Sequence, residues 1–148
     1  MRGGTENVYG IVGLATALEI AYRDMDDHVR HILGLKQYMI GQLTQHIPDV
    51  RFHGDSANPD RSLYTVLNVS LPESDDNDMV LFNLDLQGIS VSGGSACSSG
   101  AVSGSHVLAA LHPGSKRGAI RCSFSKYNTR EEIDYVVSAL AALYKESI

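Results

Sequence analysis

The sequence predicts an α+β fold in which helices cover one face of a mainly antiparallel sheet. Residues 119–125 alternate apolar and polar residues, and in residues 63–71 four leucine and valine residues share one parity while Asn68 and Ser70 have the other, which is typical of strands with one buried face. The segments before and after them repeat apolar residues at helical spacing. Because the short strand-like runs do not alternate regularly with long helices, hairpin-like strands are favoured over a parallel sheet.

Length, charge and hydropathy exclude several classes of protein. The chain has 148 residues, of which 43% are hydrophobic, enough to build one core. The net charge is -5, and no run of Lys or Arg is long enough to bind a phosphate backbone, so we expect no nucleic-acid partner. The apolar stretches are shorter than the roughly 20 residues of a membrane span, and no secretory signal pattern opens the chain. We therefore expect a cytoplasmic protein that does not enter membranes.

The first expected element is a long helix. Thr5 and Glu6 are typical of a helix start, and apolar residues then keep helical spacing as far as about Ile47, just before Pro48. This length is unusual for a globular helix. The sequence therefore predicts either a break within residues 23–27 or a helix that bridges two domains of a larger protein.

The middle of the chain is expected to hold three strands and one helix. Strand-like runs cover residues 50–53 and 63–71, with Leu63 on the same apolar face as the residues that alternate after it. Residues 75–77 are expected to cap a helix that ends at Gly88, and a short strand over residues 89–92 follows.

The last third is expected to contain a short helix over residues 107–111, a strand over 119–125 and a final helix. The final helix opens with a capping box at residues 129–132. In the strand, Cys122 shares its face with Ile120 and Phe124, which assigns its thiol to the core. Arg121 and Ser123 point to the opposite, polar face.

The stretch Ser92–Gly100, SGGSACSSG, surrounds one thiol with residues that build little core. Fixing the backbone costs about 1 to 2 kcal/mol per residue, and Gly, Ser and Ala bury little apolar area in return, so residues 93–104 are predicted to be mobile. Two interpretations of Cys97 stay open: an incidental cysteine in a linker, or a nucleophile that moves between an active site and an acceptor.

Arg121 has two interpretations as well. A guanidinium on a polar strand face can hold a carboxylate through two parallel hydrogen bonds, and it can also be an ordinary surface arginine. No metal site is expected, because His28 and His31 have no zinc-type spacing to further ligands and are interpreted as a solvated helix face. The acidic residues 75–78 lack the other ligands of a calcium loop.

Three motifs together resemble the C-terminal part of cysteine desulfurases of the NifS/IscS type. They are RGGTEN at residues 2–7, VSGGSACSSG at 91–100, and IRCSFS with the following NTREEID at 120–134. Their order and separation match that family, and the resemblance extends over essentially the whole chain.

The resemblance implies the small C-terminal domain, residues 1–148, of a fold-type I enzyme of the aminotransferase class V family that depends on pyridoxal 5'-phosphate. Residues 1–22 would link it to a large domain. Such an enzyme is a homodimer that converts L-cysteine to L-alanine and carries the sulfur as a persulfide to an iron–sulfur scaffold or another acceptor. By position, Cys97 would be the nucleophile, Arg121 would bind the substrate carboxylate, and Thr5 would bind the cofactor phosphate of the partner subunit.

One departure from the family limits what this chain does alone. The family's cofactor lysine lies in a His-Lys motif upstream of the matched region. None of the lysines in the sequence has that context: Lys36, Lys116, Lys126 and Lys145. We therefore expect part of a longer enzyme that is inactive by itself. Two alternatives stay open: an enzyme similar to selenocysteine lyase, and a non-catalytic persulfide carrier or dimerisation module.

Overall fold

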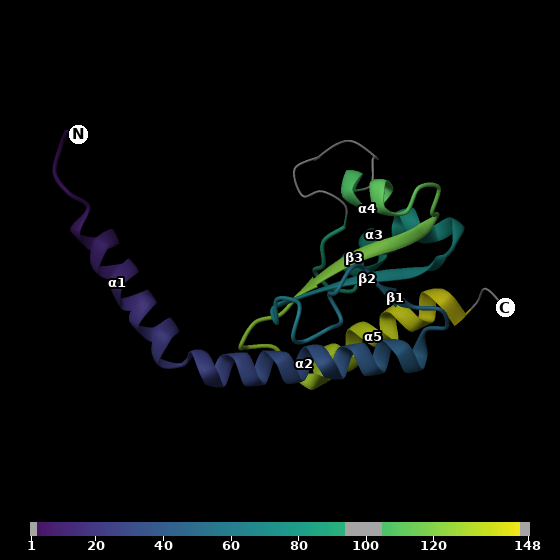
Figure 1. Ribbon diagram of the computed structural model, residues 1–148, viewed down its shortest axis with the longest axis horizontal. Coiled ribbons are helices and arrows are strands. Elements are labelled where there is room, and N and C mark those ends of the chain that lie inside the picture. Colours follow the sequence, from purple (N-terminus) through teal and green to yellow (C-terminus); the bar gives the residue numbers. More distant parts are fainter. Residues whose placement is uncertain (1–2, 94–104, 146–148) are drawn as a thin grey trace.

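A three-stranded antiparallel sheet, in the order β1-β2-β3, organises the chain in the computed structural model, which describes residues 3–93 and 105–145. Its strands are β1 (Arg51–Phe52), β2 (Val66–Glu73) and β3 (Arg117–Ser123). The helices are α1 (Val8–Arg23), α2 (Met25–His46), the 3-10 turn η1 (Asp75–Met79), α3 (Val80–Leu86), α4 (His106–Leu111) and α5 (Arg130–Lys145). Figure 1 shows α2 and α5 together under the sheet and α4 on its other side. The predicted α+β class is confirmed.

The long N-terminal helix is broken, which was one of the two predicted alternatives. α1 and α2 meet at Asp24, inside the predicted interval. The expected start at Thr5 is wrong by two residues: Asn7 is the N-cap, and its Oδ1 accepts a hydrogen bond from the amide of Gly10 at 3.1 Å. The two helices differ sharply in burial. α1 buries no residue in this chain, whereas α2 buries one face between Ile32 and Leu43.

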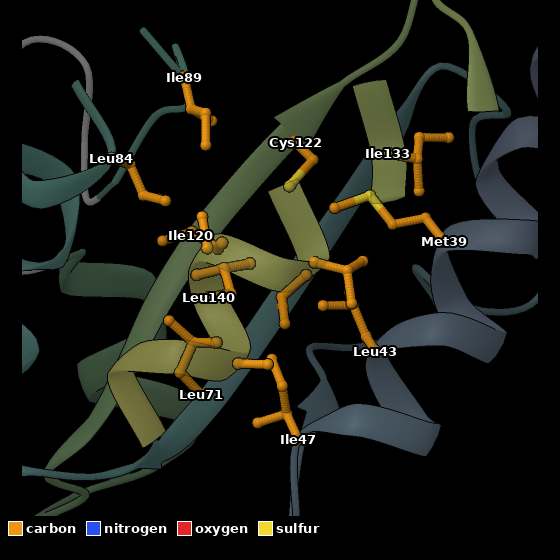
Figure 2. Packing of buried hydrophobic residues seen from close by; sticks show 14 of the residues in the cluster. Met39, Leu43, Ile47, Leu71, Leu84, Ile89, Ile120, Cys122, Ile133 and Leu140 are labelled. Atoms are coloured by element: carbon orange, nitrogen blue, oxygen red, sulfur yellow. The ribbon is translucent and has the colours of Figure 1, made fainter. Parts of the chain in front are cut away.

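The core lies between the sheet and the helix pair α2 and α5 (Figure 2). In it, the apolar face of the sheet meets helical residues that recur every three or four positions. The fully enclosed members, each no more than 2% exposed, are Met39, Leu43, Ile47, Leu67, Val69, Leu71, Leu84, Ile120 and Leu140. The alternation of β2 and β3 predicted this face correctly. None of the helices in the described ranges has both the length and the apolarity of a membrane span.

Three local predictions need correction. Leu63 does not share the buried face, because it lies in the turn before β2 and is 71% exposed. The expected strand over residues 89–92 is reduced to a single bridge at Ser92. Ser74, rather than residues 75–77, caps the helical segment, since its extended backbone lets Oγ accept a hydrogen bond from the amide of Asp76 at 3.2 Å.

Arg117 fastens the turn after α2 to the sheet. Its guanidinium donates to the Asp49 carboxylate at 2.6 Å and also to the Asp49 carbonyl. Toward β2, it donates to Ser70 Oγ at 2.8 Å and to the Ser70 carbonyl at 3.1 Å. Asp49 has a left-handed backbone with φ of 56°, which Asp tolerates better than most residues. Arg117 first and Arg51 second, by hydrogen bonding, hold the pKa of Asp49 below its ordinary value.

Replacing Arg117 with alanine is expected to lower the free energy of unfolding by about 1 to 3 kcal/mol, because buried acceptors on Ser70 lose their donor. Urea denaturation followed by circular dichroism measures the change. Arg51→Ala is the matched control, since Arg51 donates to the same Asp49 carboxylate from an exposed position and should leave the unfolding midpoint nearly unchanged. An equal loss of unfolding free energy in the two variants would contradict the stabilising role assigned to Arg117. The Arg117 contribution should shrink as the pH falls through the lowered pKa of Asp49.

Candidate functional site

Arg121 belongs to a line of four residues that crosses the polar face of the sheet, which we call the polar row: His53, Asn68, Arg121 and Ser92. Asn68 on β2 lies opposite Arg121 on β3, and Ser92 bridges Arg121 from the outer side. The register of β1, continued by one residue, brings His53 opposite Asn68, and its amide donates to the Asn68 carbonyl at 3.0 Å. Strand parity places these side chains on the side away from the core.

The pattern of backbone hydrogen bonds shows that Asn68 and Arg121 form a closely spaced cross-strand pair. The amide of Arg121 donates to the Ser92 carbonyl at 2.6 Å, and the Ser92 amide donates back to Arg121 at 3.1 Å. Asn68 directs its carbonyl the other way, toward His53. Asn68 and Arg121 therefore form a non-hydrogen-bonded antiparallel pair, the type in which Cα atoms approach to about 4.5 Å and side chains are closest.

Polar side-chain atoms of the polar row lack hydrogen-bond partners among the described residues. Arg121 is exposed, and its guanidinium has no hydrogen bond to the residues that the structure describes. Two buried atoms, Asn68 Oδ1 and His53 Nε2, also lack a hydrogen-bond partner in the described part of the chain. Buried polar atoms in native proteins are almost always paired, so the row has unused capacity to bind a polar ligand.

A second histidine lies against one end of the row. His112, which follows α4, has its ring centroid 5.5 Å from that of His53, with the ring planes inclined by 38°. Burial lowers the pKa of His53 below its ordinary value, and the charges of His112 and Arg117 lower it further. His53 is consequently neutral at neutral pH, with one ring nitrogen able to accept and one able to donate.

Cys97 lies outside the described residues, but the start of its segment does not. The segment leaves the sheet at Ser92 and Gly93, directly beside Arg121. Gly93 packs so closely that a Cβ atom there would lie 2.6 Å from Leu81 Cδ1 and 3.3 Å from the Ala119 carbonyl. An alanine at this position would therefore have to displace the Leu81 side chain and would crowd the Ala119 carbonyl.

Thr5 is not brought together with Arg121 within one chain. It is exposed and precedes the N-cap of α1 by two residues. In Figure 1 the first turn of α1 lies away from the sheet. Any shared role of these two residues needs surfaces beyond this chain.

Cys122 is a core residue, as predicted. Its side chain points from β3 into the packed layer in Figure 2, and it is 5% exposed. Burial raises the pKa of the thiol to about 12, so almost no reactive thiolate forms near neutral pH. The thiol also lines a cavity of about 320 Å³ between β3, α5 and residues 88–91, which Arg121 and Asn68 do not line.

Neither a metal cluster nor a cofactor lysine is evident in the part of the chain that the structure covers. No group of three or more His, Cys, Asp or Glu residues is arranged to hold a metal in that part. Lys36 is 1% exposed and donates to Ser62 Oγ at 2.9 Å and to the Leu63 carbonyl at 2.7 Å. Burial lowers its pKa. Through these hydrogen bonds Lys36 anchors the loop before β2.

Sequence reasoning singled out Arg121 as a candidate but not Asn68 and His53, its neighbours in the polar row. The parity of β2 did place Asn68 on the polar face. What the sequence lacks is the register that sets Asn68 opposite Arg121, since strands about fifty residues apart in the chain pair through tertiary packing.

Known proteins resemble this chain over most of its length. The family model for aminotransferase class V matches residues 1–136. The chain is 35% identical to cysteine desulfurase IscS of Dictyoglomus turgidum over 147 residues, which are 98% of this chain and 36% of the relative. It is 34% identical to cysteine desulfurase NifS of Azotobacter vinelandii over 138 residues, 92% of this chain and 33% of the relative.

Solved structures give the same answer for the fold. A NifS-like protein superposes with a TM-score of 0.73 at 31% identity, covering 96% of this chain and 35% of the other. A NifS-like protein from Rickettsia africae superposes with a TM-score of 0.75 at 27% identity, covering 97% of this chain and 36% of the other. The chain thus spans about a third of the length of the relatives that it matches. With the family model matching most of its length, the chain belongs to the aminotransferase class V family.

Proposed function

We propose that this chain is the C-terminal domain of a pyridoxal-phosphate-dependent cysteine desulfurase, which converts L-cysteine to L-alanine and holds the released sulfur as a persulfide on Cys97. One observation carries the proposal: the Ser92–Arg121 backbone pair ties the start of the Cys97 segment to the strand that presents Arg121. The cysteine desulfurase names of the relatives support this function over the selenocysteine lyase and carrier alternatives.

Covalent geometry supports a shared site for Cys97 and Arg121. Five peptide units separate Ser92 from Cys97, and an extended chain of that length spans at most about 18 Å. Because Ser92 is hydrogen-bonded to Arg121, this bound on the distance from the Ser92 Cα to the Cys97 Cα tethers Cys97 to a point beside Arg121. A substrate whose carboxylate is bound at Arg121 lies within this reach, and so does an acceptor docked at the nearby surface.

Each proposed residue has a task that fits its chemistry. The exposed guanidinium of Arg121 offers two parallel donors to the substrate carboxylate. The Cys97 thiolate forms a bond to the substrate sulfur while the bond from that sulfur to the substrate carbon breaks, and the electron pair stays with the carbon that becomes alanine. Pyridoxal phosphate, when bound, supplies the electron sink for that carbon.

The donor set of this chain fits only the edge of a cofactor site. A Thr hydroxyl near the start of a helix suits a phosphate, so Thr5 is proposed to bind the cofactor phosphate of a partner subunit. No lysine of this chain has the His-Lys context of the family's attachment point, and Lys36 Nζ already donates to Ser62 Oγ and to the Leu63 carbonyl. The attachment residue is therefore proposed to lie in a large domain outside this chain.

The surface of α1 supports the proposed linking role of residues 1–22. Apolar side chains surround this helix, yet it buries none of them in this chain; Tyr9 is 93% exposed and Leu14 is 73% exposed. Apolar exposure of this extent is typical of a surface that packs against another part of a protein. The homodimer, the iron–sulfur scaffold as sulfur acceptor and the cytoplasmic location remain predictions.

A chimera tests the proposed function. In IscS of Dictyoglomus turgidum the third that matches this chain is replaced by residues 1–148. The chimera is expected to bind pyridoxal phosphate and to form alanine and sulfide from L-cysteine with a reductant present. The same exchange with the matching third of Azotobacter vinelandii NifS controls for the junction. If the NifS exchange is active, and this chimera binds the cofactor but forms no alanine, the proposal is wrong.

A further inference from the structure

Asn68 is the least explained residue of the polar row. Its backbone carbonyl is held firmly, since it accepts hydrogen bonds from the His53 amide at 3.0 Å and from Ser56 Oγ at 3.1 Å. Its side-chain Oδ1, by contrast, is buried and has no partner among the residues described. A fixed backbone with an unused buried acceptor indicates that the side chain serves an interaction outside the hydrogen bonds that hold the fold.

The donor best placed for this acceptor is the guanidinium of Arg121. The two residues lie opposite each other in the narrow, non-hydrogen-bonded arrangement, where cross-strand side chains make their closest contacts. A guanidinium carries five N–H donors, and a bidentate carboxylate uses two of them. Donors therefore remain for Asn68 Oδ1 while a carboxylate is bound.

We infer that Asn68 is a positioning residue that selects substrates with a free carboxylate. The structure does not form a hydrogen bond between Arg121 and Asn68 Oδ1. When a carboxylate binds, Arg121 donates to Asn68 Oδ1, which fixes the plane of the guanidinium so that its remaining donors face the carboxylate as a rigid pair. The inference rests on the proposed function, in which Arg121 binds the carboxylate of the amino-acid substrate. It adds a residue on β2 to a recognition site that the sequence motifs place on β3 alone.

Asn68→Leu in the active chimera tests the inference, because leucine has a similar size and no acceptor. Steady-state rates are measured with L-cysteine and with L-cysteinamide, which lacks the carboxylate. The KM for L-cysteine is expected to rise about tenfold with little change in kcat, as for one lost hydrogen bond to a charged group. The rate with L-cysteinamide should not change. Ser123→Ala, on the same face of β3, is the matched control and should alter neither substrate.

The outcomes separate this inference from the proposed function. If Arg121→Ala does not reduce the preference for L-cysteine over L-cysteinamide, the carboxylate assignment itself fails. If Arg121→Ala reduces that preference and Asn68→Leu lowers both rates equally, Asn68 is merely structural and the inference is overturned. In an Arg121→Ala background, Asn68→Leu should add no further loss, since the two residues act as a unit.

If Asn68→Leu fails to fold, the inference can still be tested on the chimera without this substitution. In the isotopically labelled chimera, the side-chain amide signals of Asn68 should shift when L-alanine is added, because the product carries the same carboxylate. L-Alaninamide should leave these signals unchanged. Equal responses to both compounds, or no response to L-alanine at saturation, would overturn the inference.

Discussion

Replacing Cys97 with serine in the chimera is expected to reduce sulfur release from L-cysteine to the background rate. A hydroxyl has a far higher pKa than a thiol and cannot form the sulfur–sulfur bond of a persulfide. The cofactor absorbance should stay unchanged, because Cys97 contacts the substrate sulfur rather than the cofactor ring in this proposal. Alanine and sulfide assays measure the loss, and mass spectrometry of the protein tests for the additional sulfur on Cys97.

Cys122 provides the internal control for this experiment. Its thiol is buried in the layer between β3 and the helices, with its pKa raised to about 12, so brief alkylation of the folded protein should modify Cys97 and spare Cys122. Alkylated chimera should lose activity to the same extent as Cys97→Ser. Full sulfur release after either treatment would remove Cys97 from the mechanism and leave the incidental-linker interpretation.

Arg121→Ala is expected to raise the KM for L-cysteine about a hundredfold, because two charge-assisted hydrogen bonds together are worth about 3 kcal/mol. Initial rates over a wide range of L-cysteine concentrations measure the change. Arg121→Lys should recover only part of the affinity, since a lysine offers a point charge in place of the planar pair of donors.

A second arginine controls for the loss of positive charge. Arg30 on α2 is exposed and, among the described residues, pairs with Asp27 alone, so Arg30→Ala should leave the KM unchanged. If Arg121→Ala also leaves the KM unchanged, Arg121 is an ordinary surface arginine and the substrate carboxylate is bound elsewhere.

The sequence predicted most clearly the features that depend on local periodicity. The alternation in β2 and β3 identified the buried face, the placement of Cys122 in the core and the polar side of Arg121. The same reasoning failed at Leu63, which shares the parity of Leu67 but is separated from it by the polar Thr65 and lies in the turn before β2. At both predicted helix starts the observed N-cap is a nearby polar residue, Asn7 or Ser74, instead of the predicted one. Several adjacent polar side chains could accept a hydrogen bond from the free amides of the first turn, so the sequence did not single out one of them.

Features that depend on long-range pairing could not be predicted in the same way. The position of Asn68 beside Arg121 follows from strand register, which the sequence of one strand does not encode. The clamp of Arg117 on Asp49 joins residues 68 positions apart. Thr5 was assigned through motif resemblance alone, and the resemblance decided between the two interpretations of Cys97 that its loop composition left open; both residues stay proposals.

The contrast in burial between α1 and the rest of the chain has a thermodynamic consequence. All residues of the core cluster follow the Asp24 junction, so the sheet with α2 and α5 can unfold as one cooperative unit. A single helix of 16 residues with no packing of its own is marginal in water. When this chain is heated alone, the helical signal of α1 should therefore fade gradually and ahead of the sharp main transition, so the melt departs from two-state behaviour.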